Sequence, residues 1–225
     1  MDMILRLYYF IGSLVCHQLP ERTIFIEGMP LPMCARDTGI YLGIFIALAF
    51  LLVRGRFKAD TVPSTRISVF LAILMIPMMV DAVTSYASIR QTDNIIRLVT
   101  GIFFGMSLVL FLFPAANFKT NEPGRLKVID GWVDVILLAV LNILVCTVIL
   151  RFNILVWAVV STASLIGLVF IIGRLIYTLI RILSIGNPKR SIIYTCVLTI
   201  IAFVMLHILK GFLLGPVKSF LVSLF

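Results

Sequence analysis

The chain has 225 residues, of which 61% are hydrophobic and only 13% are charged, and its mean hydropathy is +1.15. A soluble domain carries about twice that share of charged residues, and here several apolar runs of about twenty residues follow one another with short polar breaks. The composition excludes a disordered chain, a secreted disulfide scaffold and a coiled coil. It predicts an all-α fold, a polytopic transmembrane helical bundle whose backbone hydrogen bonds are satisfied within the helices.

The net charge of +9 comes from nineteen Lys and Arg against ten Asp and Glu. In a soluble protein this balance would favour a nucleic-acid partner, but here the positive charges lie in short connections between apolar runs. There they indicate orientation and contact with anionic head groups, so the expected partners are membrane lipids and not nucleic acid. Two of the four cysteines, Cys146 and Cys196, lie inside apolar runs, where packing is the simplest interpretation.

The first apolar run covers residues 3–15. As a helix it would measure about 20 Å, which is short for a hydrocarbon core of about 30 Å. We expect it to be extended, to tilt or to lie partly re-entrant. No small-residue cleavage site follows it, so we expect it to be retained and not removed as a signal peptide.

The later spans are predicted more firmly, because each ends in charged residues or in Gly, Pro and Asn. Residues 211–225 form an apolar tail that we expect to be interfacial or re-entrant, which gives six or seven spans within one membrane domain over 1–225. Residues 1–117 form a polar motif half of this domain, and residues 118–225 form an apolar half. The predicted later spans are 40–53, 67–89, 98–116, 133–150, 154–180 and 192–209.

Orientation follows from the Lys and Arg residues in alternate connections. One set of connections and helix ends holds eleven of these residues and the other holds five. The richer set should be cytoplasmic. This predicts a multi-pass protein of the cell membrane with residues 16–37 and 86–97 together on the extracytoplasmic face.

The densest polar segment lies between the first two apolar runs. Two thiols, one imidazole and two carboxylates occur between Cys16 and Asp37, a mixture that suits zinc. Cys16 and His17 are adjacent, so both could reach one ion only if the chain turns there, which Pro20 favours. A disulfide between Cys16 and Cys34 and a pair of unpaired or redox-active thiols are the alternatives.

A second polar group follows the third apolar run. Asp81 lies inside that run, where an ionisable side chain faces the bundle interior and needs a partner, which Arg36, Arg90 or Arg97 could supply. Arg90, Asn94 and Arg97 follow at spacings of four and three, so in a helix they share one face. Such a face could hold a phosphate or carboxylate through guanidinium groups, and anchoring to lipid head groups is the simpler alternative.

Polar residues of the second half carry weaker signals. Asp130 and Asp134 suit the beginning of a helix, where carboxylates favour the helix dipole. Arg174 and Arg181 lie seven residues apart and are expected to mark a lipid-contacting cytoplasmic extension. His207 and Lys210 are expected at a helix end.

The motif Cys-His-Gln-x-Pro-Glu-Arg begins at Cys16, and the chain continues from Cys34 as Cys-Ala-Arg-Asp-Thr-Gly-Ile-Tyr. This combination resembles a family of small prokaryotic membrane proteins catalogued as a domain of unknown function. The resemblance covers roughly the first half of the chain and includes these further residues: Pro77, Asp81, Arg90, Asn94, Arg97, Thr100, Gly101 and Gly105.

The family pattern has a third cysteine where this chain has Asp37. The resemblance therefore implies a site made of Cys16, His17, Cys34 and Asp37, and aspartate can bind zinc through oxygen. It also implies that the two polar groups belong to one site, but it supplies no reaction.

Three functions fit this pattern. In the first, a metal-supported pocket binds or acts on an anionic, lipid phosphate-like ligand, and Glu21 or Asp81 serves as acid or base. In the second, the protein is a carrier or flippase in which Asp81 and Arg90 form a switchable pair. In the third, it is an assembly protein stapled through Cys16 and Cys34. The residues expected to bind the anion are Arg22, Arg36, Arg90, Asn94 and Arg97.

Overall fold

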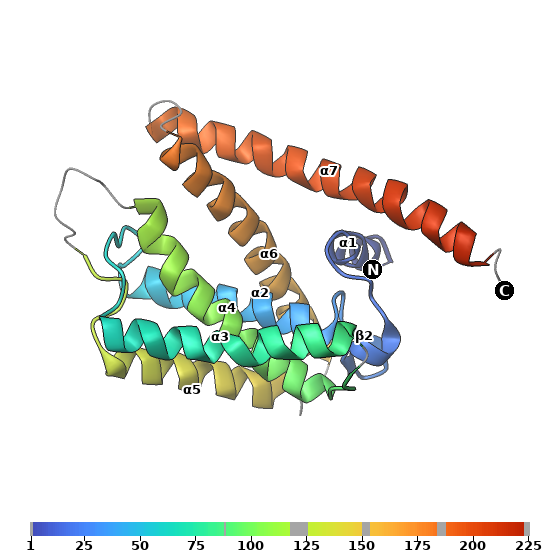
Figure 1. Cartoon of the computed structure of the whole chain (residues 1–225), viewed down its shortest axis with the longest axis horizontal. Helices are drawn as coiled ribbons and strands as arrows, with labels where there is room; N and C mark the ends of the chain where they lie inside the picture. Colours follow the sequence, from blue (N-terminus) through green and yellow to red (C-terminus); the bar gives the residue numbers. More distant parts are fainter. Residues whose placement is uncertain (1, 88, 118–125, 150–153, 184–187, 223–225) are drawn as a thin grey trace.

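The computed structural model describes residues 2–87, 89–117, 126–149, 154–183 and 188–222. The chain folds as helices apart from one short hairpin (Figure 1). The expected boundary between residues 117 and 118 falls at the edge of a segment outside the described residues. The elements are α1 (Asp2–Ser13), the 3-10 helix η1 (Pro20–Arg22), β1 (Phe25–Ile26), β2 (Met29–Pro30), α2 (Ala35–Val53), α3 (Thr65–Tyr86), α4 (Asn94–Asn117), α5 (Trp132–Ile149), α6 (Ile154–Ile182) and α7 (Pro188–Val222).

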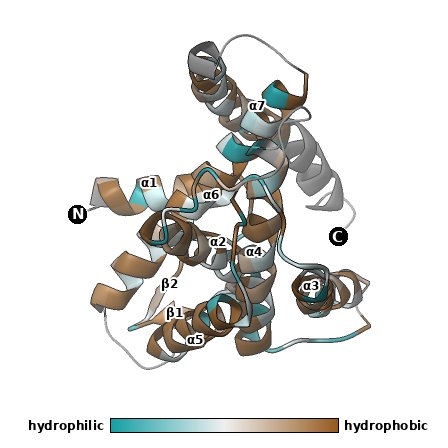
Figure 2. Cartoon of the chain, turned by 90° about the vertical axis from the view of Figure 1, so that its left-hand side faces the viewer, coloured by the Kyte–Doolittle hydropathy of each residue, from teal (hydrophilic) through white to brown (hydrophobic). Residues whose placement is uncertain are grey.

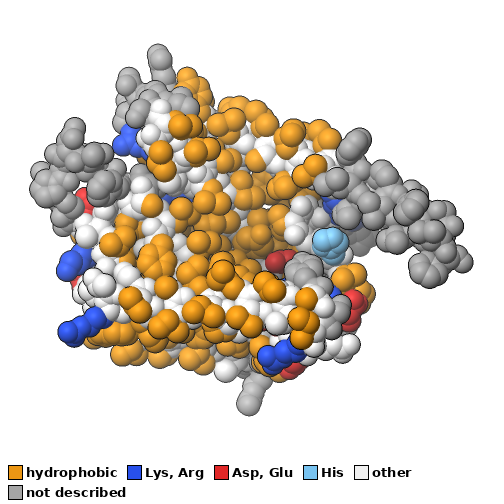
Figure 3. Space-filling model, viewed as in Figure 1, with side chains coloured by type: hydrophobic (Ala, Val, Ile, Leu, Met, Phe, Trp, Pro, Cys, Tyr) orange, Lys and Arg blue, Asp and Glu red, His pale blue; other side chains and the backbone are white. Residues whose placement is uncertain are grey.

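Six helices in the described part of the chain, α2 to α7, are long and apolar enough to cross a membrane. Hydrophobic residues make up most of each helix, and hydrophilic residues lie mostly in the connecting segments and at helix ends (Figure 2). In the space-filling view, apolar atoms cover the middle of the face and charged side chains lie toward its two ends (Figure 3). The protein is an all-α polytopic membrane protein, as its composition predicts.

The centre of the bundle is a close contact between α2 and α4. A Cβ atom added at Gly43 would lie 2.0 Å from the carbonyl oxygen of Ile102, and one added at Gly105 would lie 1.9 Å from that of Ile40. These distances leave no room for a side chain, so the two backbones touch as they do in membrane helix pairs with small residues four positions apart. The same pattern continues at Gly39 and Gly101.

Helix direction alternates along the chain, which brings distant residues to common ends. Gly39 faces the carbonyl of Leu98, so α2 and α4 begin at the same end of the bundle. The indole of Trp157 near the beginning of α6 donates to the Pro30 carbonyl at 2.8 Å, so α6 begins there as well. We call this end, which also carries the segment 16–34, the motif end.

The first helix, α1, does not behave as a span. It has twelve residues, or about 18 Å of helix. It is seen end-on where α2, α3 and α5 run lengthwise (Figure 1), and lengthwise where they are seen end-on (Figure 2). α1 therefore lies across the bundle at the motif end, the position of an interfacial helix.

The last helix corrects the expected break before residue 211. α7 continues as one helix of 35 residues to Val222, so His207 and Lys210 lie within it and not at its end. α7 packs against α6 at its beginning and then separates from it as it runs back toward the motif end (Figure 1). There the centre of the His207 ring lies 5.3 Å from the centre of the Phe10 ring of α1.

At the other end of the bundle, which we call the latch end, two ion pairs join arginines after α2 to aspartates near the beginning of α5. Arg54 donates to Asp134 at 2.6 Å and Arg56 pairs with Asp130. The Asp134 carboxylate also accepts from the Asp130 amide at 2.9 Å, the capping contact expected at a helix start.

Arg174 corrects the expectation of a lipid-contacting helix extension. Its side chain is buried and donates to the Phe113 carbonyl at 3.0 Å and to Asn117 Oδ1 at 3.1 Å. The guanidinium also lies 4.2 Å from the centre of the Phe113 ring. Arg174 therefore joins α6 to the end of α4, because the alternative in the membrane would be an unsatisfied charge.

Candidate functional site

The segment between α1 and α2 is folded tightly at the motif end. β1 and β2 pair antiparallel through a turn at Glu27 and Gly28, whose φ angles of 50° and 78° suit a two-residue hairpin. The Tyr9 hydroxyl donates to the Pro30 carbonyl at 2.7 Å, alongside the Trp157 indole. The hairpin is therefore attached to both α1 and α6.

Gln18 fixes the turn that leads into the hairpin. Its backbone is left-handed, with φ of 53°, a conformation that costs free energy in a residue other than glycine. Its side-chain amide donates to the Tyr9 and Pro32 carbonyls, each at 2.8 Å, and its backbone N–H donates to Cys16 Sγ at 3.4 Å. Gln18 thus positions Cys16, a role that sequence reasoning missed because its partners are backbone carbonyls.

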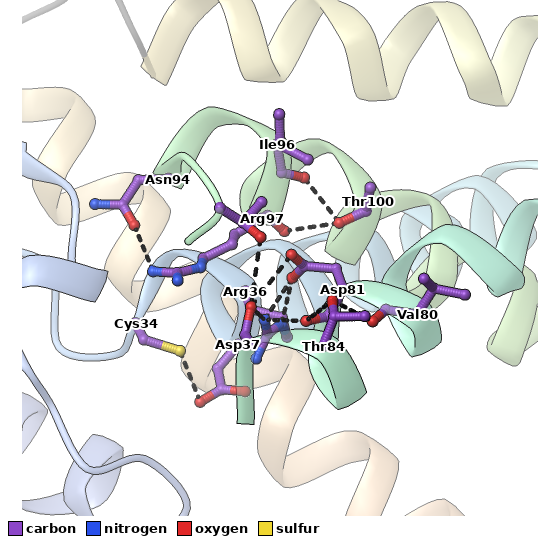
Figure 4. A network of polar contacts seen from close by, with 12 residues as sticks. Cys34, Arg36, Asp37, Val80, Asp81, Thr84, Asn94, Ile96, Arg97 and Thr100 are labelled. Carbon is purple, nitrogen blue, oxygen red and sulfur yellow. Dashed lines mark hydrogen bonds and ion pairs between the residues drawn. The ribbon is translucent and has the colours of Figure 1, made fainter. Parts of the chain in front are cut away.

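Cys16, Cys34 and Asp37 come together at the beginning of α2. One ligand atom from each residue lies within 4.8 Å of the others, and this group could hold a metal ion. Cys34 is the residue before the helix and Asp37 is three positions further along, so their side chains lie on one face. The Cys34 thiol donates to Asp37 Oδ2 at 3.2 Å (Figure 4).

The two thiols form no disulfide, and their surroundings shift their pKa values in opposite directions. The hydrogen bond from Cys34 lowers the pKa of the Cys16 thiol, whose sulfur also accepts the Cys34 backbone N–H at 3.1 Å. The same pairing, together with burial and the nearby Asp37 charge, raises the pKa of Cys34. Cys16 is therefore the more readily ionised of the pair, and Cys34 keeps its proton until something replaces it.

A pocket of about 300 Å³ opens beside these three residues, and Arg22, Arg36 and His17 also line it. His17 was expected in the ligand set, but its ring nitrogens lie outside the group of three ligand atoms. The physical reason is the adjacency of Cys16 and His17. The turn that directs Cys16 toward the Cys34 backbone leaves His17 exposed on the wall of the pocket.

Arg36 and Asp81 form a buried ion pair between α2 and α3 (Figure 4). Arg36 Nε donates to Asp81 Oδ2 at 3.0 Å and the same guanidinium reaches the Asp81 carbonyl at 3.3 Å. The Ser85 hydroxyl lies 3.5 Å from Asp81 Oδ1. The partner that a buried Asp81 requires is therefore Arg36, one of the three candidates that the sequence offered.

Asn94 and Arg97 lie on one face of α4, as their spacing predicts, and Arg97 Nη1 donates to Asn94 Oδ1 at 3.2 Å. The Asn94 amide donates to the carbonyls of Glu21 and Thr23 at 3.2 and 3.3 Å, which ties the motif segment to α4. Arg97 is buried and its Nε has no hydrogen-bond partner within the described structure. The three-residue face does not form, because α4 begins at Asn94 and leaves Arg90 exposed before it.

The two acid–base candidates lie in different surroundings. Glu21 is exposed on η1, beside Arg22, whereas the carboxylate of Asp81 is occupied by Arg36. The motif end therefore brings together three residues that could hold a metal ion (the candidate metal-binding group), a pocket with two arginines, and a buried ion pair. Residues 16–37 and 81–97 meet there, as the sequence predicts.

The chain was compared with known families and proteins. Residues 16–111, the segment that builds the motif end, match the family described as "Predicted membrane protein (DUF2085)". The chain belongs to this family. An uncharacterized protein of Methanothermobacter thermautotrophicus is 37% identical over 97 residues, which is 43% of this chain and 82% of that protein.

A second relative is an uncharacterized protein of Methanocaldococcus jannaschii, 33% identical over 106 residues, or 47% of this chain. The match spans 66% of that protein, just under two thirds of its length. No solved structure matches the chain. The family membership agrees with the fold, and the site must be interpreted from its own geometry.

Proposed function

We propose that Cys16, Cys34 and Asp37 bind zinc, and that the adjacent pocket binds an anionic, lipid phosphate-like ligand next to the metal. The observation that carries this proposal is the arrangement of three ligand atoms within 4.8 Å of one another on the wall of a pocket that two arginines also line. Neither feature alone would indicate a function. Together they combine a metal site with an anion site.

The donor set suits zinc more than magnesium or calcium. Thiolates select borderline and soft ions, whereas magnesium and calcium prefer oxygen ligands. Zinc bonds of about 2.3 Å to sulfur and about 2.1 Å to oxygen require tetrahedral ligands about 3.5–3.8 Å apart. Separations of up to 4.8 Å need to contract by about 1.0–1.3 Å, and the 3.2 Å contact between Cys34 and Asp37 needs to lengthen slightly. Side-chain rotation supplies both changes. Three protein ligands leave a fourth position for water, for ligand or for His17.

The ligand is proposed as an anion because positive side chains surround the site. Arg22 and Arg36 line the pocket, and Arg97 adds a buried positive charge near the Arg36–Asp81 pair (Figure 4). A guanidinium matches the oxygens of a phosphate in two-point contacts. Arg90 and Asn94 remain candidates at the edge of the site, although Asn94 also holds the motif segment.

If the protein is an enzyme, the metal would polarise a phosphoryl oxygen of the bound ligand, and Glu21 or Asp81 would transfer the proton. Glu21 is exposed and precedes Arg22, which lines the pocket. Asp81 would act only after its contact with Arg36 is broken, so its principal contribution in this proposal is to position Arg36.

We propose that the motif end faces the extracytoplasmic side of the cell membrane, as the distribution of Lys and Arg predicts. Lys58 and Asp93 are exposed beyond opposite ends of the bundle. Membrane-impermeant thiol labelling of intact cells should modify Asp93→Cys and spare Lys58→Cys. Labelling of Lys58→Cys alone would reverse the orientation.

Two alternatives have specific support. A buried, switchable ion pair favours a carrier or flippase, with Arg36 taking the place expected for Arg90 as the partner of Asp81. The closeness of the two thiols favours an assembly protein stapled by a disulfide between Cys16 and Cys34. A carrier should move a phosphate-bearing lipid between leaflets without product formation, and a stapled protein should bind neither metal nor anion.

Native mass spectrometry from mild detergent tests the metal proposal. The wild-type protein should carry one zinc ion, and Cys16→Ser, Cys34→Ser and Asp37→Asn should each lose it. Cys196→Ser is the matched control, because Cys196 is exposed on α7 and outside the group, and it should retain the metal. A wild-type mass lower by two hydrogen atoms and free of metal would instead establish the disulfide.

A further inference from the structure

Three hollows follow one another along the chain from α1 to the beginning of α2, and only one belongs to the site already described. A groove of about 450 Å³ lies between α1 and α6, beside residues 7–11. A second hollow of about 220 Å³ lies between the end of α1 and α7, beside residues 13–17. The ligand pocket follows beside residues 15–37 and shares Val15, Cys16 and His17 with the second hollow.

The α1–α6 groove has an apolar lining. Leu7 and Ile11 of α1 face Ile166 and Val169 of α6 across it. Its one hydroxyl pair is already satisfied, because Tyr8 and Thr162 hydrogen-bond to each other at 2.6 Å. The volume falls in the usual range for small-molecule sites, about 300–1,000 Å³. Such a lining suits a hydrocarbon chain and offers nothing to a polar ligand.

The groove and the candidate metal-binding group are connected by a shared wall. Leu165 lines the groove and packs in one hydrophobic cluster with Cys16 and Met33, against which Ile11, Val15 and Cys34 also pack. Ile11 lines the groove and Val15 lines the pocket, and the chain passes from one to the other across the end of α1 at Ser13. The apolar groove therefore ends within four residues of the place where the polar pocket begins.

Positive side chains lie at only one end of the three hollows, as a ligand with an apolar chain and an anionic head group would require. Lys210 lines the second hollow and Arg22 lines the pocket, so positive side chains stand at the end that lies nearest the candidate metal-binding group. α6 contributes the groove from within a membrane span, Leu155–Ile182, whereas α1 lies across the bundle at the motif end. The three hollows thus extend from the membrane-spanning part of α6 to the polar motif end of the bundle.

We propose that the α1–α6 groove holds an acyl chain of a phospholipid whose phosphate head group occupies the Arg22 pocket. The lipid enters sideways from the bilayer beneath α1. This inference rests on the proposed function and specifies its ligand as a membrane lipid instead of a water-soluble phosphate. In this arrangement α1 lies beside the point where the acyl chain of the lipid joins its head group.

Photo-crosslinking tests the groove. The protein is reconstituted in dioleoylphosphatidylcholine vesicles that contain a phosphatidate with a diazirine in its acyl chain. Adducts should map to α1 and to residues 162–170 of α6. Excess unlabelled phosphatidate should suppress them, whereas inorganic phosphate should not. Adducts spread equally over α3 and α5 would overturn the proposal, and so would equal suppression by inorganic phosphate.

Paired variants separate the groove from a general effect of added bulk. Val169→Trp fills the groove, while Val140→Trp adds the same indole on α5; the two valines are 44% and 52% exposed, so both changes are expected to fold. Val169→Trp should lose the adducts and keep its zinc, and Val140→Trp should keep both. Equal crosslinking of the two variants would overturn the groove proposal alone. Groove adducts in a wild-type protein without zinc would overturn the metal proposal alone.

Discussion

Arginine and aspartate meet at both ends of the bundle, but their surroundings differ. At the latch end, Arg54 and Arg56 pair with Asp134 and Asp130 on a surface where one partner of each pair is partly exposed. At the motif end, the Arg36–Asp81 pair is buried, and thiols, a carboxylate and a pocket lie in front of it. At the latch end, arginine and aspartate only hold helices together. At the motif end, the same residue types also lie next to a pocket that Arg36 lines.

The comparison is tested most strongly at Asp81. Replacement by Asn leaves Arg36 as a buried charge without its partner, so we expect a loss of about 3–5 kcal/mol in the free energy of unfolding. Denaturation in detergent followed by circular dichroism measures it. The double variant Arg36→Met with Asp81→Leu removes both charges and should recover most of the loss. A double variant as unstable as Asp81→Asn would show that the pair is not the cause.

Gly105 tests the contact between α2 and α4 that supports the motif end. A methyl group there meets the Ile40 carbonyl at 1.9 Å, so Gly105→Ala should force the helices apart. We expect a destabilisation of about 1–3 kcal/mol, the range for overpacked cores, measured by the same denaturation. Gly131→Ala is the control, since nothing lies within 4 Å of a Cβ there. Equal stability of the two variants would contradict the close contact.

Gln18 tests the positioning of Cys16. Gln18→Ala removes two hydrogen bonds to the Tyr9 and Pro32 carbonyls, which should cost about 1–3 kcal/mol of stability. Zinc affinity should also fall, because Cys16 is no longer held beside Cys34. Isothermal titration with zinc measures this effect, and Gln91→Ala, at an exposed position, should leave the affinity unchanged. Unchanged affinity in Gln18→Ala would remove its positioning role.

The two thiols of the motif end predict that zinc affinity depends on pH. The pKa of Cys34 is raised, so in the absence of metal Cys34 is protonated at neutral pH, and zinc must displace that proton. Zinc affinity should therefore rise by about tenfold per pH unit, or more steeply where Cys16 also releases a proton, as pH increases toward the Cys34 pKa. Titrations between pH 6 and pH 8 in different buffers would report the released proton. A flat profile would contradict zinc binding through Cys34.

Arg56 should show the smallest effect. Arg56→Gln breaks a pair whose aspartate side chain is 64% exposed, so the expected loss is about 0.2–1 kcal/mol, and zinc binding should not change. A loss comparable with that of Asp81→Asn would contradict the distinction between the two ends.

The sequence predicts the spans within a few residues where hydropathy changes sharply, as at Val53 and Trp132. It misplaces the start of α2, expected at Ile40 and observed at Ala35, because Arg36 and Asp37 are polar residues inside a helix. Arg36 is satisfied by a tertiary contact with Asp81 and Asp37 by a local contact with Cys34, and hydropathy measures neither. Arg174 is misjudged for the same reason, since its burial depends on the Phe113 carbonyl and ring.

Of the four residues that the sequence assigns to a metal site, Cys16, Cys34 and Asp37 come together and His17 lies apart. Dense polar residues between apolar runs identify residues 16–37, and the spacing of Asn94 and Arg97 identifies the face of α4. His17 is separated from the three ligand atoms by a backbone turn, and that turn depends on the left-handed conformation of Gln18. Arg90 is separated from its expected face because α4 begins four residues later.

The glycine contacts between α2 and α4 limit how this protein can move. With backbone against backbone at four positions, neither helix can slide or rotate past the other without a steric clash. Arg36 and Arg97 are therefore mounted on a single rigid unit. Any opening or closing of the motif end must therefore move other helices relative to the α2–α4 pair, such as α3, which carries Asp81.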